Sequence, residues 1–427
     1  MKIFITGATG FVGRHLIRRL ASMDHKPVCL VRRNTDIREL LKADTDIVWG
    51  DIREKGTLYK AMKGCDWVFH LAGISSFWEA DREMYSQTNI DGTRTVMECA
   101  LETGARKVVL LSSMTVYGKP LQSPFHEDDT IGPKRFSRYA LSRYEGDLVA
   151  WGLHYKKGLP LVVCYPGVVL GPQSNDHLCG IIRRLIQHRM PAKAFMNSVH
   201  TYVHADDLAH AVIGAAQKGD SVGKRYFIGN TRMTVRELLD MISSISGVRS
   251  PSITMPDSAA IICAHLFTAL ADIIKRPPAF GMALDFVRTL REGLSADGSK
   301  AQHELGISYT PVRNALAEEI DFIRMQERLY DRRQVRRIKA DMPVSYRAQG
   351  QDHEMNARLG DISEKGMFLK TDTPPGTGKY ISANLYGDRQ DRYFHVQGRV
   401  LRRSHAGMAV EIMQSDRDIS HILLENR

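Results

Sequence analysis

Short apolar stretches alternate with helical patterns from residue 1 to about residue 170. Runs rich in β-branched and aromatic residues, bounded by polar turns, predict the strands Lys2–Thr6, Val28–Arg32, Asp46–Gly50, Trp67–Leu71, Lys107–Ser112 and Leu161–Tyr165. Several of these runs are apolar at every position, which is typical of strands covered by helices on both faces. The alternation predicts an α/β domain with a Rossmann-type, doubly wound parallel sheet.

The pattern changes twice beyond this region. From about 171 to 325 it is helix-rich and irregular, as expected of a substrate-binding lobe, and a charged helix over Leu316–Leu329 leads into an arginine cluster. Six short strand candidates follow, separated by Gly, Pro and Asp turns: Val344–Arg347, Glu354–Asp361, Met367–Lys370, Tyr380–Tyr386, Tyr393–Arg402 and Gly407–Met413. Their spacing predicts a small all-β barrel. We expect two domains, 1–328 and 329–427.

One stretch, Ala259–Ala271, comes closest to a membrane-spanning pattern. It is shorter than the roughly 18 uncharged apolar residues that a spanning helix needs, carries His265 and leads into Asp272. We expect a core helix or a cap over the substrate. The alternative is a helix that contacts a membrane surface peripherally.

The residues after the first strand form a glycine-rich loop. Gly7, Gly10 and Gly13 precede an amphipathic pattern that continues through Arg14–Leu20. Glycine at these spacings permits a tight turn, close approach of a pyrophosphate and close packing of helix on strand. The helix N-terminus adds free N–H groups and the positive end of its dipole. The loop therefore predicts a dinucleotide-binding site.

The end of the second predicted strand indicates which dinucleotide binds. An acidic residue about 20 residues beyond the glycines would accept a hydrogen bond from a ribose hydroxyl and indicate NAD(H). This chain instead has Arg32 and Arg33, which can pair with a 2′-phosphate. We therefore favour NADP(H) over NAD(H); the alternative is a solvated basic turn.

The net charge and the cysteine content indicate which partners, metal sites and cellular location to expect. The 427-residue chain has a formal net charge of +11, which suits anionic partners such as nucleotides. The arginine-rich segments are not interleaved with aromatic residues on which bases could stack, so we do not expect nucleic acid as a partner. Six cysteines are scattered through apolar runs without metal-ligand spacing, so we expect no metal site and a reducing, cytoplasmic location. The chain begins directly in its first strand, without a signal-peptide pattern.

Eight motifs in order resemble the extended short-chain dehydrogenase/reductase family. They are Gly7-x-x-Gly10-x-x-Gly13, Gly50-Asp51-Ile52, His70-Leu71-Ala72-Gly73, Asn89-x-x-Gly92-Thr93, Ser112-Ser113-Met114-Thr115-Val116-Tyr117-Gly118, Tyr139-Ala140-Leu141-Ser142-Arg143, Tyr165-Pro166-Gly167 and Val203-His204-Ala205-Asp206-Asp207. The resemblance covers about the first 325 residues. It implies an NAD(P)-dependent enzyme, and this family often forms homodimers.

The resemblance also implies catalytic roles. Tyr139 corresponds to the proton donor or base, Ser113 to the hydroxyl that hydrogen-bonds the substrate oxygen, and Arg143 to the cation one helical turn further on. A fixed cation and the charge of the nicotinamide lower a phenol pKa from about 10 toward the working range. The family usually has lysine where this chain has Arg143, which keeps the charge but is bulkier and planar.

The predicted cofactor-binding set combines the loop, the basic strand end and the family motifs. It consists of Gly7, Thr9, Gly10, Phe11, Val12, Gly13, Arg32, Arg33, Asp51, Ile52, Leu71, Ala72, Gly73, Asn89, Tyr139, Arg143, Pro166 and Val168.

The region Ala259–Ile323 and the arginine-ended second strand resemble the dihydroflavonol reductase and 3β-hydroxysteroid dehydrogenase branch. This implies hydride transfer on an alcohol or ketone that is small or lipid-like. One alternative is a nucleotide-sugar epimerase or dehydratase for exopolysaccharide synthesis, in which Arg183, Arg184 and Arg189 would grip a diphosphate. Another is a nucleotide-bound scaffold that acts as a signalling adaptor, a hypothesis kept open by Arg143.

The C-terminal region resembles the PilZ domain, a small β-barrel that binds cyclic di-GMP. The resemblance rests on Arg333-x-x-x-Arg337 ahead of the barrel and on Asp361-Ile362-Ser363-Glu364-Lys365-Gly366 at a strand end. Arginines fork onto phosphates or guanine edges, and a short Asp and Ser supply acceptor and donor groups. The implied ligand residues are Arg332, Arg333, Arg336, Arg337, Asp361, Ser363 and Gly366. Cyclic di-GMP would then be a regulatory ligand.

Overall fold

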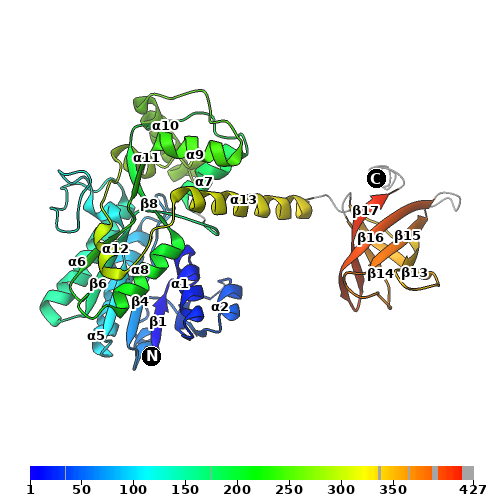
Figure 1. Ribbon diagram of the computed structural model, residues 1–427, viewed down its shortest axis with the longest axis horizontal. Coiled ribbons are helices and arrows are strands. Elements are labelled where there is room, and N and C mark those ends of the chain that lie inside the picture. Colours follow the sequence, from blue (N-terminus) through cyan, green and yellow to red (C-terminus); the bar gives the residue numbers. More distant parts are fainter. Residues whose placement is uncertain (34, 175, 335–337, 364–365, 387–392, 416–427) are drawn as a thin grey trace. The chain divides into compact units, whose positions relative to one another are not determined.

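A computed structural model describes residues 1–33, 35–174, 176–334, 338–363, 366–386 and 393–415. The contacts within the chain divide it into two compact units, Met1–Ile323 and Arg324–Arg427. Figure 1 shows the elements of each unit, which are described here one unit at a time.

Helices and strands alternate along the first unit. Its helical elements are α1 (Phe11–Ser22), α2 (Arg38–Lys42), α3 (Lys55–Met62), α4 (Glu83–Tyr85), the π-helix η1 (Ser86–Gly92), α5 (Thr93–Glu102), the 3₁₀ helix η2 (Met114–Tyr117), α6 (Arg138–Lys157), α7 (His177–Ile186), α8 (Ala205–Gln217), α9 (Val235–Ser246), α10 (Asp257–Ile274), the 3₁₀ helix η3 (Ala279–Gly281), α11 (Leu284–Glu292) and α12 (Ser299–Leu305). Helix α13 (Val312–Gln334) begins in this unit and continues past its last residue, Ile323. Its strands are β1 (Ile3–Thr6), β2 (Val28–Val31), β3 (Asp46–Trp49), β4 (Trp67–His70), β5 (Lys107–Leu111), β6 (Leu161–Pro166), β7 (Val168–Leu170), β8 (Val199–His204), β9 (Arg225–Ile228) and β10 (Thr231–Thr234).

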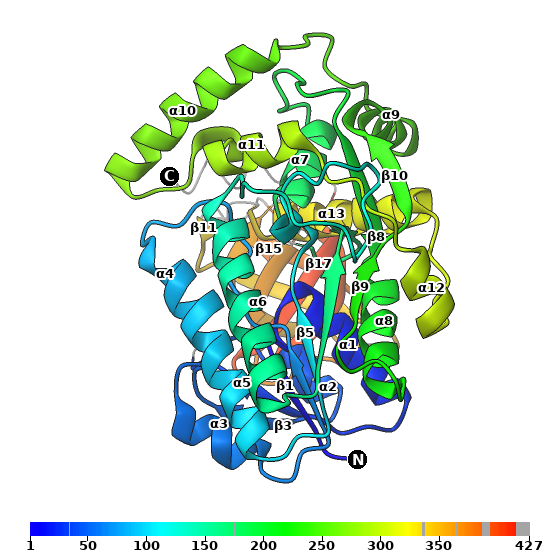
Figure 2. The same cartoon turned by 90° about the vertical axis from the view of Figure 1, so that its left-hand side faces the viewer.

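The main sheet of the first unit has seven parallel strands in the order β3-β2-β1-β4-β5-β6-β9. Alternate residues of a strand face opposite sides, so Val109 and Leu111 belong to one core while Val108 and Leu110 belong to the other. Helices α1, α8 and α12 cover the first face, and α3, α5 and α6 cover the second (Figure 2). The predicted Rossmann-type fold class is confirmed.

All six predicted strands of this sheet are present, with ends that differ by one residue at most. The sequence pattern did not indicate β9, the seventh strand, nor the small second sheet formed by β10, β8 and β7. These strands are three to six residues long and interrupt the helix-rich region, where short apolar runs are ambiguous.

The apolar stretch expected to form a core or cap helix is the centre of α10. The core interpretation is wrong: α10 buries Ala260, Ala264 and Ala271, whereas Leu266 and Ile273 are 65% and 78% exposed. A small hydrophobic cluster joins the alanine side of α10 to α11 through Val287.

The second unit is a closed antiparallel barrel. Its strands are β11 (Ile338–Lys339), β12 (Pro343–Ala348), β13 (Met355–Ser363), β14 (Gly366–Lys370), β15 (Tyr380–Tyr386), β16 (Tyr393–Ser404) and β17 (Gly407–Ser415). The order β13-β12-β15-β16-β17-β14 closes because β14 also pairs with β13. Alternate residues such as Val344, Tyr346 and Ala348 fill the core. The predicted barrel is confirmed, and each of its six predicted strands is present.

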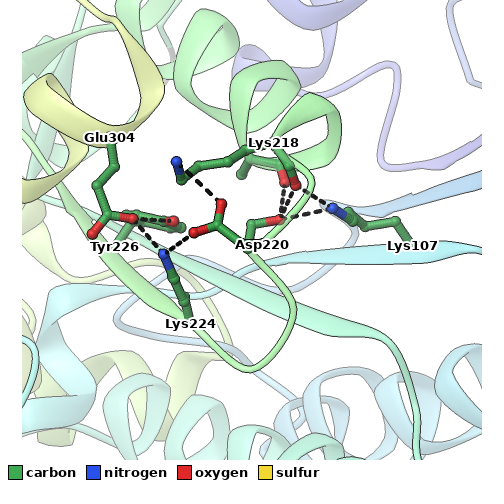
Figure 3. Close-up of polar contacts among 8 residues, drawn as sticks. Lys107, Lys218, Asp220, Lys224, Tyr226 and Glu304 are labelled. Carbon is green, nitrogen blue, oxygen red and sulfur yellow. Dashed lines mark hydrogen bonds and ion pairs between the residues drawn. The ribbon is translucent and has the colours of Figure 1, made fainter.

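A polar network ties α8, β9 and α12 together at one edge of the main sheet (Figure 3). Asp220 accepts from Lys218 at 3.1 Å and from Lys224 at 2.9 Å. Glu304 on α12 accepts from Lys224 at 2.8 Å and from the Tyr226 hydroxyl at 2.9 Å. The network fixes the turn that delivers β9 to the sheet.

Lys107, at the start of β5, supplies the buried part of this network. Its ammonium donates to the Lys218 carbonyl and, at 2.9 Å, to the Ser221 hydroxyl. Burial lowers the pKa of Lys107 from its ordinary value. The buried ammonium satisfies two oxygen atoms, so its removal would take a charged donor away from both of them.

We expect Lys107→Met to lower the free energy of unfolding of the first unit by about 2 kcal/mol, because the two acceptors lose a charged donor. Urea unfolding followed by tryptophan fluorescence measures this, since all four tryptophans (Trp49, Trp67, Trp78 and Trp151) lie in the first unit. The exposed Lys60→Met is the matched control and should change little. Equal effects of the two variants would contradict the role given to Lys107.

Candidate functional site

The glycine loop makes two close backbone contacts that only glycine permits. Gly7 has a φ of +78°, and a Cβ there would lie 2.6 Å from the backbone nitrogen of Ala72. A Cβ on Gly13 would lie 2.1 Å from the carbonyl oxygen of Gly7. The loop therefore packs directly on the end of β4, and α1 packs directly on the loop.

These contacts leave the N-terminus of α1 available at the carboxyl ends of the strands. Gly10 caps the helix in an extended conformation, and its N–H donates to the Gly7 carbonyl at 3.0 Å. Thr9, Phe11 and Val12 complete the loop and first turn, which contains no acidic residue. The first turn thus offers backbone donors and a positive dipole end, as a diphosphate requires.

The loop after β4 is held by a buried amide. Leu71, Ala72 and Gly73 follow the strand, and the amide of Asn89 donates to the Ile74 carbonyl at 3.1 Å and accepts from the Ile74 N–H at 2.8 Å. Asn89 lies in the π-helix η1 and is 1% exposed. In this structure Asn89 therefore fixes the loop after β4 in place.

Tyr139 and Arg143 lie one turn apart on the buried face of α6. The Arg143 guanidinium lies against Gly73, where an added Cβ would approach it to 2.4 Å. Its Nη1 reaches the Leu111 carbonyl at 3.4 Å, and its Nε is buried with no hydrogen-bond partner among the described residues. The structure thus brings Arg143 to the carboxyl ends of β4 and β5, with one buried donor left to engage a ligand.

Ser113 follows β5 and caps the 3₁₀ helix η2. Its hydroxyl oxygen accepts from the Thr115 N–H at 3.2 Å and from the Thr115 hydroxyl at 2.9 Å. Ser113 acts only as an acceptor in both contacts, so its own proton can be donated to a ligand oxygen.

Sequence reasoning missed Asp147, one turn beyond Arg143 on the same face of α6. Burial raises the pKa of Asp147 to about 6, against the lowering effects of Ser112, Tyr165 and Arg143. An acidic residue at four-residue spacing from the predicted cation was the signal in the sequence. Its burial could be known only from the fold.

Sequence reasoning also missed an aromatic cluster around Tyr139. Phe77 contacts the Tyr139 ring edge-on at 5.4 Å between centroids, and also contacts His177 and Phe286 at 5.1 Å and 5.5 Å. Burial lowers the pKa of His177 to about 4, so this ring is neutral at physiological pH. The cluster joins three segments that are far apart in the sequence and places the Phe77 ring against Tyr139.

At the other end of the site, Arg32 and Arg33 follow β2 and are both exposed. Asp51 is hydrogen-bonded by Arg53 at 2.8 Å, and mainly because of this bond its pKa is lowered. Ile52 is buried and packs against Gly92. The basic strand end is therefore open to an anionic group.

Pro166 ends β6 and Val168 begins β7, so these two predicted residues flank the junction between the two sheets. Gly167 lies between them because a Cβ would approach the Thr201 carbonyl oxygen to 2.3 Å.

The described part of the first unit contains at least two clefts. One of about 430 Å³ lies between the Phe77 loop, the start of α6 and α10, and is lined by Trp78, Arg138 and His265 among others. The other, about 750 Å³, lies beside the 118–125 loop and includes Arg236 and Arg291. Phe77 lines the first cleft and contacts Tyr139, so this cleft adjoins the predicted proton donor.

In the second unit the predicted ligand residues Asp361, Ser363 and Gly366 lie at the junction of β13 and β14. The Ser363 hydroxyl donates to the Gly366 carbonyl at 2.9 Å. Asp361 of β13 lies opposite Lys339 of β11 in the antiparallel strand pairing. Arg332 and Arg333 fall near the end of α13, where only the backbone is described, and Arg336 and Arg337 lie outside the described residues. Since β11 begins one residue after Arg337, the arginine segment leads directly to the strand that pairs at Asp361.

Comparison with known proteins supplies the family. Residues 3–229 match the NAD dependent epimerase/dehydratase family, and residues 330–426 match the PilZ domain. The chain is 29% identical to a putative dihydroflavonol 4-reductase of Synechocystis over 74% of this chain and 93% of that protein. It is 27% identical to sterol demethylase protein B of Methylococcus capsulatus over 76% and 98% of the two chains.

Among solved structures, the UDP-glucuronic acid 4-epimerase of Bacillus cereus, in complex with UDP-glucuronic acid and NAD, has the same fold as the first unit. Its TM-score is 0.61 at 22% identity, over 76% of this chain and all of that one. The glycine loop, the parallel strand order and these matches lead to one conclusion: the chain belongs to the NAD dependent epimerase/dehydratase family and carries a C-terminal PilZ domain.

Proposed function

We propose that this protein is an NADP(H)-dependent oxidoreductase that interconverts an alcohol and a ketone on an apolar, lipid-like substrate. The single observation that carries the proposal is the aromatic cluster of Phe77, His177 and Phe286, whose member Phe77 contacts Tyr139. A hydrophobic, uncharged wall beside the predicted proton donor suits an apolar ketone better than a charged sugar nucleotide. The similarity to a dihydroflavonol reductase and a sterol demethylase protein supports the same substrate class.

The residues present fit a dinucleotide at the glycine loop. The backbone contacts of Gly7 and Gly13 hold the loop against β4 and α1, and the first turn of α1 presents backbone donors. When bound, the nicotinamide supplies or accepts the hydride. Arg143, with its buried Nε, would bind ribose hydroxyls beside the phenol.

The chain's own groups would handle the proton. Tyr139 would donate its phenol proton to the ketone oxygen as hydride reaches the carbonyl carbon, and would take the proton back in the reverse reaction. Ser113 would donate a second hydrogen bond to the same oxygen, because Thr115 occupies its acceptor side. The positive charge of Arg143 would favour the phenolate that remains.

We propose NADP(H) as the preferred cofactor. Arg32 and Arg33 are exposed at the end of β2, and the nearby Asp36 is already paired with Arg38. Asp36 is therefore a poor acceptor for a ribose hydroxyl, and the two arginines can form charge-assisted bonds to a 2′-phosphate.

We propose cyclic di-GMP as the ligand of the PilZ domain, held by the arginine segment together with Asp361 and Ser363. Its binding would regulate the enzyme if the ligand distinguishes two arrangements of the chain. The homodimer and the cytoplasmic location stay predictions.

A second candidate is nucleotide-sugar epimerisation. Arg184, at the end of α7, is the observation that favours it, because its half-buried guanidinium lies against Gly281 and burial lowers its pKa. A partly desolvated arginine in the substrate lobe suits a diphosphate. Tightly retained cofactor without net turnover would support this candidate.

Tyr139→Phe tests the reductase. We expect turnover of NADPH with a 3-keto steroid to fall by about 10²–10⁴-fold, because the proton donor is lost. Calorimetric affinity for NADPH should be unchanged. Tyr144→Phe, on the same helix beneath Arg135, is the matched control and should keep its activity. If Tyr139→Phe is as active as the wild type, Tyr139 is not the proton donor, whereas a wild type that binds NADPH without turnover would support the nucleotide-bound scaffold.

Cofactor preference is tested with the double variant Arg32→Ala/Arg33→Ala. NADPH affinity should fall at least about tenfold, since two charge-assisted bonds to phosphate are removed. NADH affinity should hardly change. Arg106→Ala, at the amino end of β5 where it pairs with Asp66, should alter neither affinity. An equal loss for both dinucleotides would contradict the NADP(H) preference.

The pKa of Asp147 predicts a pH dependence. Because the folded-state pKa is raised from 3.8 to about 6, the folded protein binds more protons than the unfolded chain between these values. The stability that Asp147 contributes is therefore present at low pH and is lost as pH rises through 6. Asp147→Asn should become more stable relative to the wild type by about 2 kcal/mol from pH 4 to pH 7.

Tryptophan fluorescence in urea at each pH measures this difference. The exposed Asp240→Asn is the control, and its difference from the wild type should not depend on pH in this range. A pH-independent difference for Asp147→Asn would show that this carboxyl ionises normally in the folded protein.

A further inference from the structure

Helix α10 (Asp257–Ile274) has its hydrophobic side turned outward. It buries only alanines, at 260, 264 and 271, while Ile262, Leu266, Leu270 and Ile273 are between 53% and 78% exposed. A helix that packs on a protein core normally buries its large aliphatic side chains and exposes its small or polar ones. Packing within this unit therefore does not account for the large side chains of α10.

The exposed aliphatic residues form one stripe. Positions 262, 266, 270 and 273 are separated by four, four and three residues, which places them on one face of an α-helix. Ile274 extends the stripe at the end of the helix, and Phe280 in the following turn is also half exposed. We call these six residues the α10 stripe. A continuous apolar surface of this kind marks a binding surface.

The helix lies along the unit. Figure 2 shows α10 beside α11 at the outer edge of the first unit, and Ala260 and Ala264 share a hydrophobic cluster with Val287 of α11. Asp272 accepts from the Trp78 indole at 3.0 Å and pairs with Arg82. Among the described helices, α10 has the length and mean hydropathy (1.6) of a membrane span. Because one side is attached to the protein, the geometry fits a helix lying in a membrane interface rather than crossing it.

Charges at the ends of α10 fit an acidic lipid surface. Its two acidic residues are engaged within the protein, since Asp257 accepts from the Phe195 N–H at 3.0 Å and Asp272 is paired as described. Lys275 and Arg276 follow the stripe directly and are both exposed. An apolar stripe bordered by lysine and arginine is the pattern of a helix that binds anionic membrane surfaces.

A third side of α10, between the stripe and the alanines, lines the cleft next to the predicted proton donor. His265, Thr268, Ala269 and Asp272 border the 430 Å³ cleft, which also contains Phe77. Phe77 contacts Tyr139. A membrane against the α10 stripe would thus lie one helix away from the cleft.

We propose that the α10 stripe is a docking surface for a bilayer containing anionic phospholipids, and that it places the cleft where an apolar substrate can enter from the membrane. The docking stands by itself, whereas the entry of substrate rests on the proposed function. Insertion of the aliphatic side chains removes them from water, and Lys275 and Arg276 then lie at the level of the headgroups.

Co-sedimentation of the full-length protein with vesicles tests the docking. The wild type should bind vesicles of equal parts phosphatidylcholine and phosphatidylglycerol. Leu266→Glu/Leu270→Glu should weaken this binding at least about tenfold, because two exposed apolar side chains become charged. Leu148→Glu, at an exposed leucine on α6, is the matched control and should bind as the wild type does. Lys275→Glu/Arg276→Glu should weaken binding to the acidic vesicles and make it insensitive to salt.

The proposal is overturned if the wild type does not bind these vesicles, or if Leu148→Glu weakens the binding as much as Leu266→Glu/Leu270→Glu does. A further measurement applies if the wild type does not bind: whether Leu266→Glu/Leu270→Glu converts a dimer of the wild type to a monomer. Such a conversion would assign the stripe to a second copy of the chain. Calorimetric affinity for NADPH should be the same in all variants, which shows that they are folded.

Activity on a 3-keto steroid embedded in the vesicles separates the two proposals. If the wild type binds vesicles but does not reduce the steroid, the proposed function fails while the docking stands. If it reduces the steroid in detergent as well as in vesicles, and the stripe variant loses only the vesicle reaction, entry of substrate from the membrane is supported.

Discussion

The close approach of backbone at the glycine loop is the constraint on which the dinucleotide site depends. Gly7 contacts the backbone after β4, and Gly13 contacts the Gly7 carbonyl, so strand, loop and helix lie closer together than any side chain would allow. From the other side, His15 on α1 is hydrogen-bonded to Asp206 on α8. The N-terminus of α1 is therefore held at the centre of the sheet, where the strand order reverses between β1 and β4 and where ligands of such sheets bind.

Helix α6 carries the chemistry that this site can use. Tyr139, Arg143 and Asp147 follow each other at four-residue intervals on its buried face. The helix comes close to η1 because Gly146 lies against the Asn89 carbonyl, where a Cβ would be 2.3 Å from the oxygen. On this face burial raises the pKa of the Asp147 carboxyl, and Arg143 acts against this rise.

An aromatic cluster lies on one side of Tyr139, and Phe77 of this cluster contacts the phenol ring. The adjoining cleft reaches from Phe77 to α10 and also carries charged side chains such as Arg138 and Asp285, whereas α10 presents its large aliphatic residues outward. The PilZ barrel has a separate core and a separate set of ligand-binding candidates. The chain therefore joins two folds, each with its own hydrophobic core.

Local patterns determined a large part of this protein. The alternation of apolar runs gave the strands of the parallel sheet and of the barrel, because a strand buried on one or both faces must carry apolar residues at fixed positions. Gly7, Gly10 and Gly13 indicated the nucleotide site. A close contact between backbone atoms leaves no room for a side chain, so it requires glycine at a particular position and is visible in the sequence. Tertiary structure alone decided the rest. The burial of Asp147, the meeting of Phe77, His177 and Phe286, and the outward face of α10 all depend on segments far apart in sequence. The apolar composition of α10 resembles that of a core helix. Which of its faces is buried depends on the elements that pack against it, and these are known only from the tertiary structure.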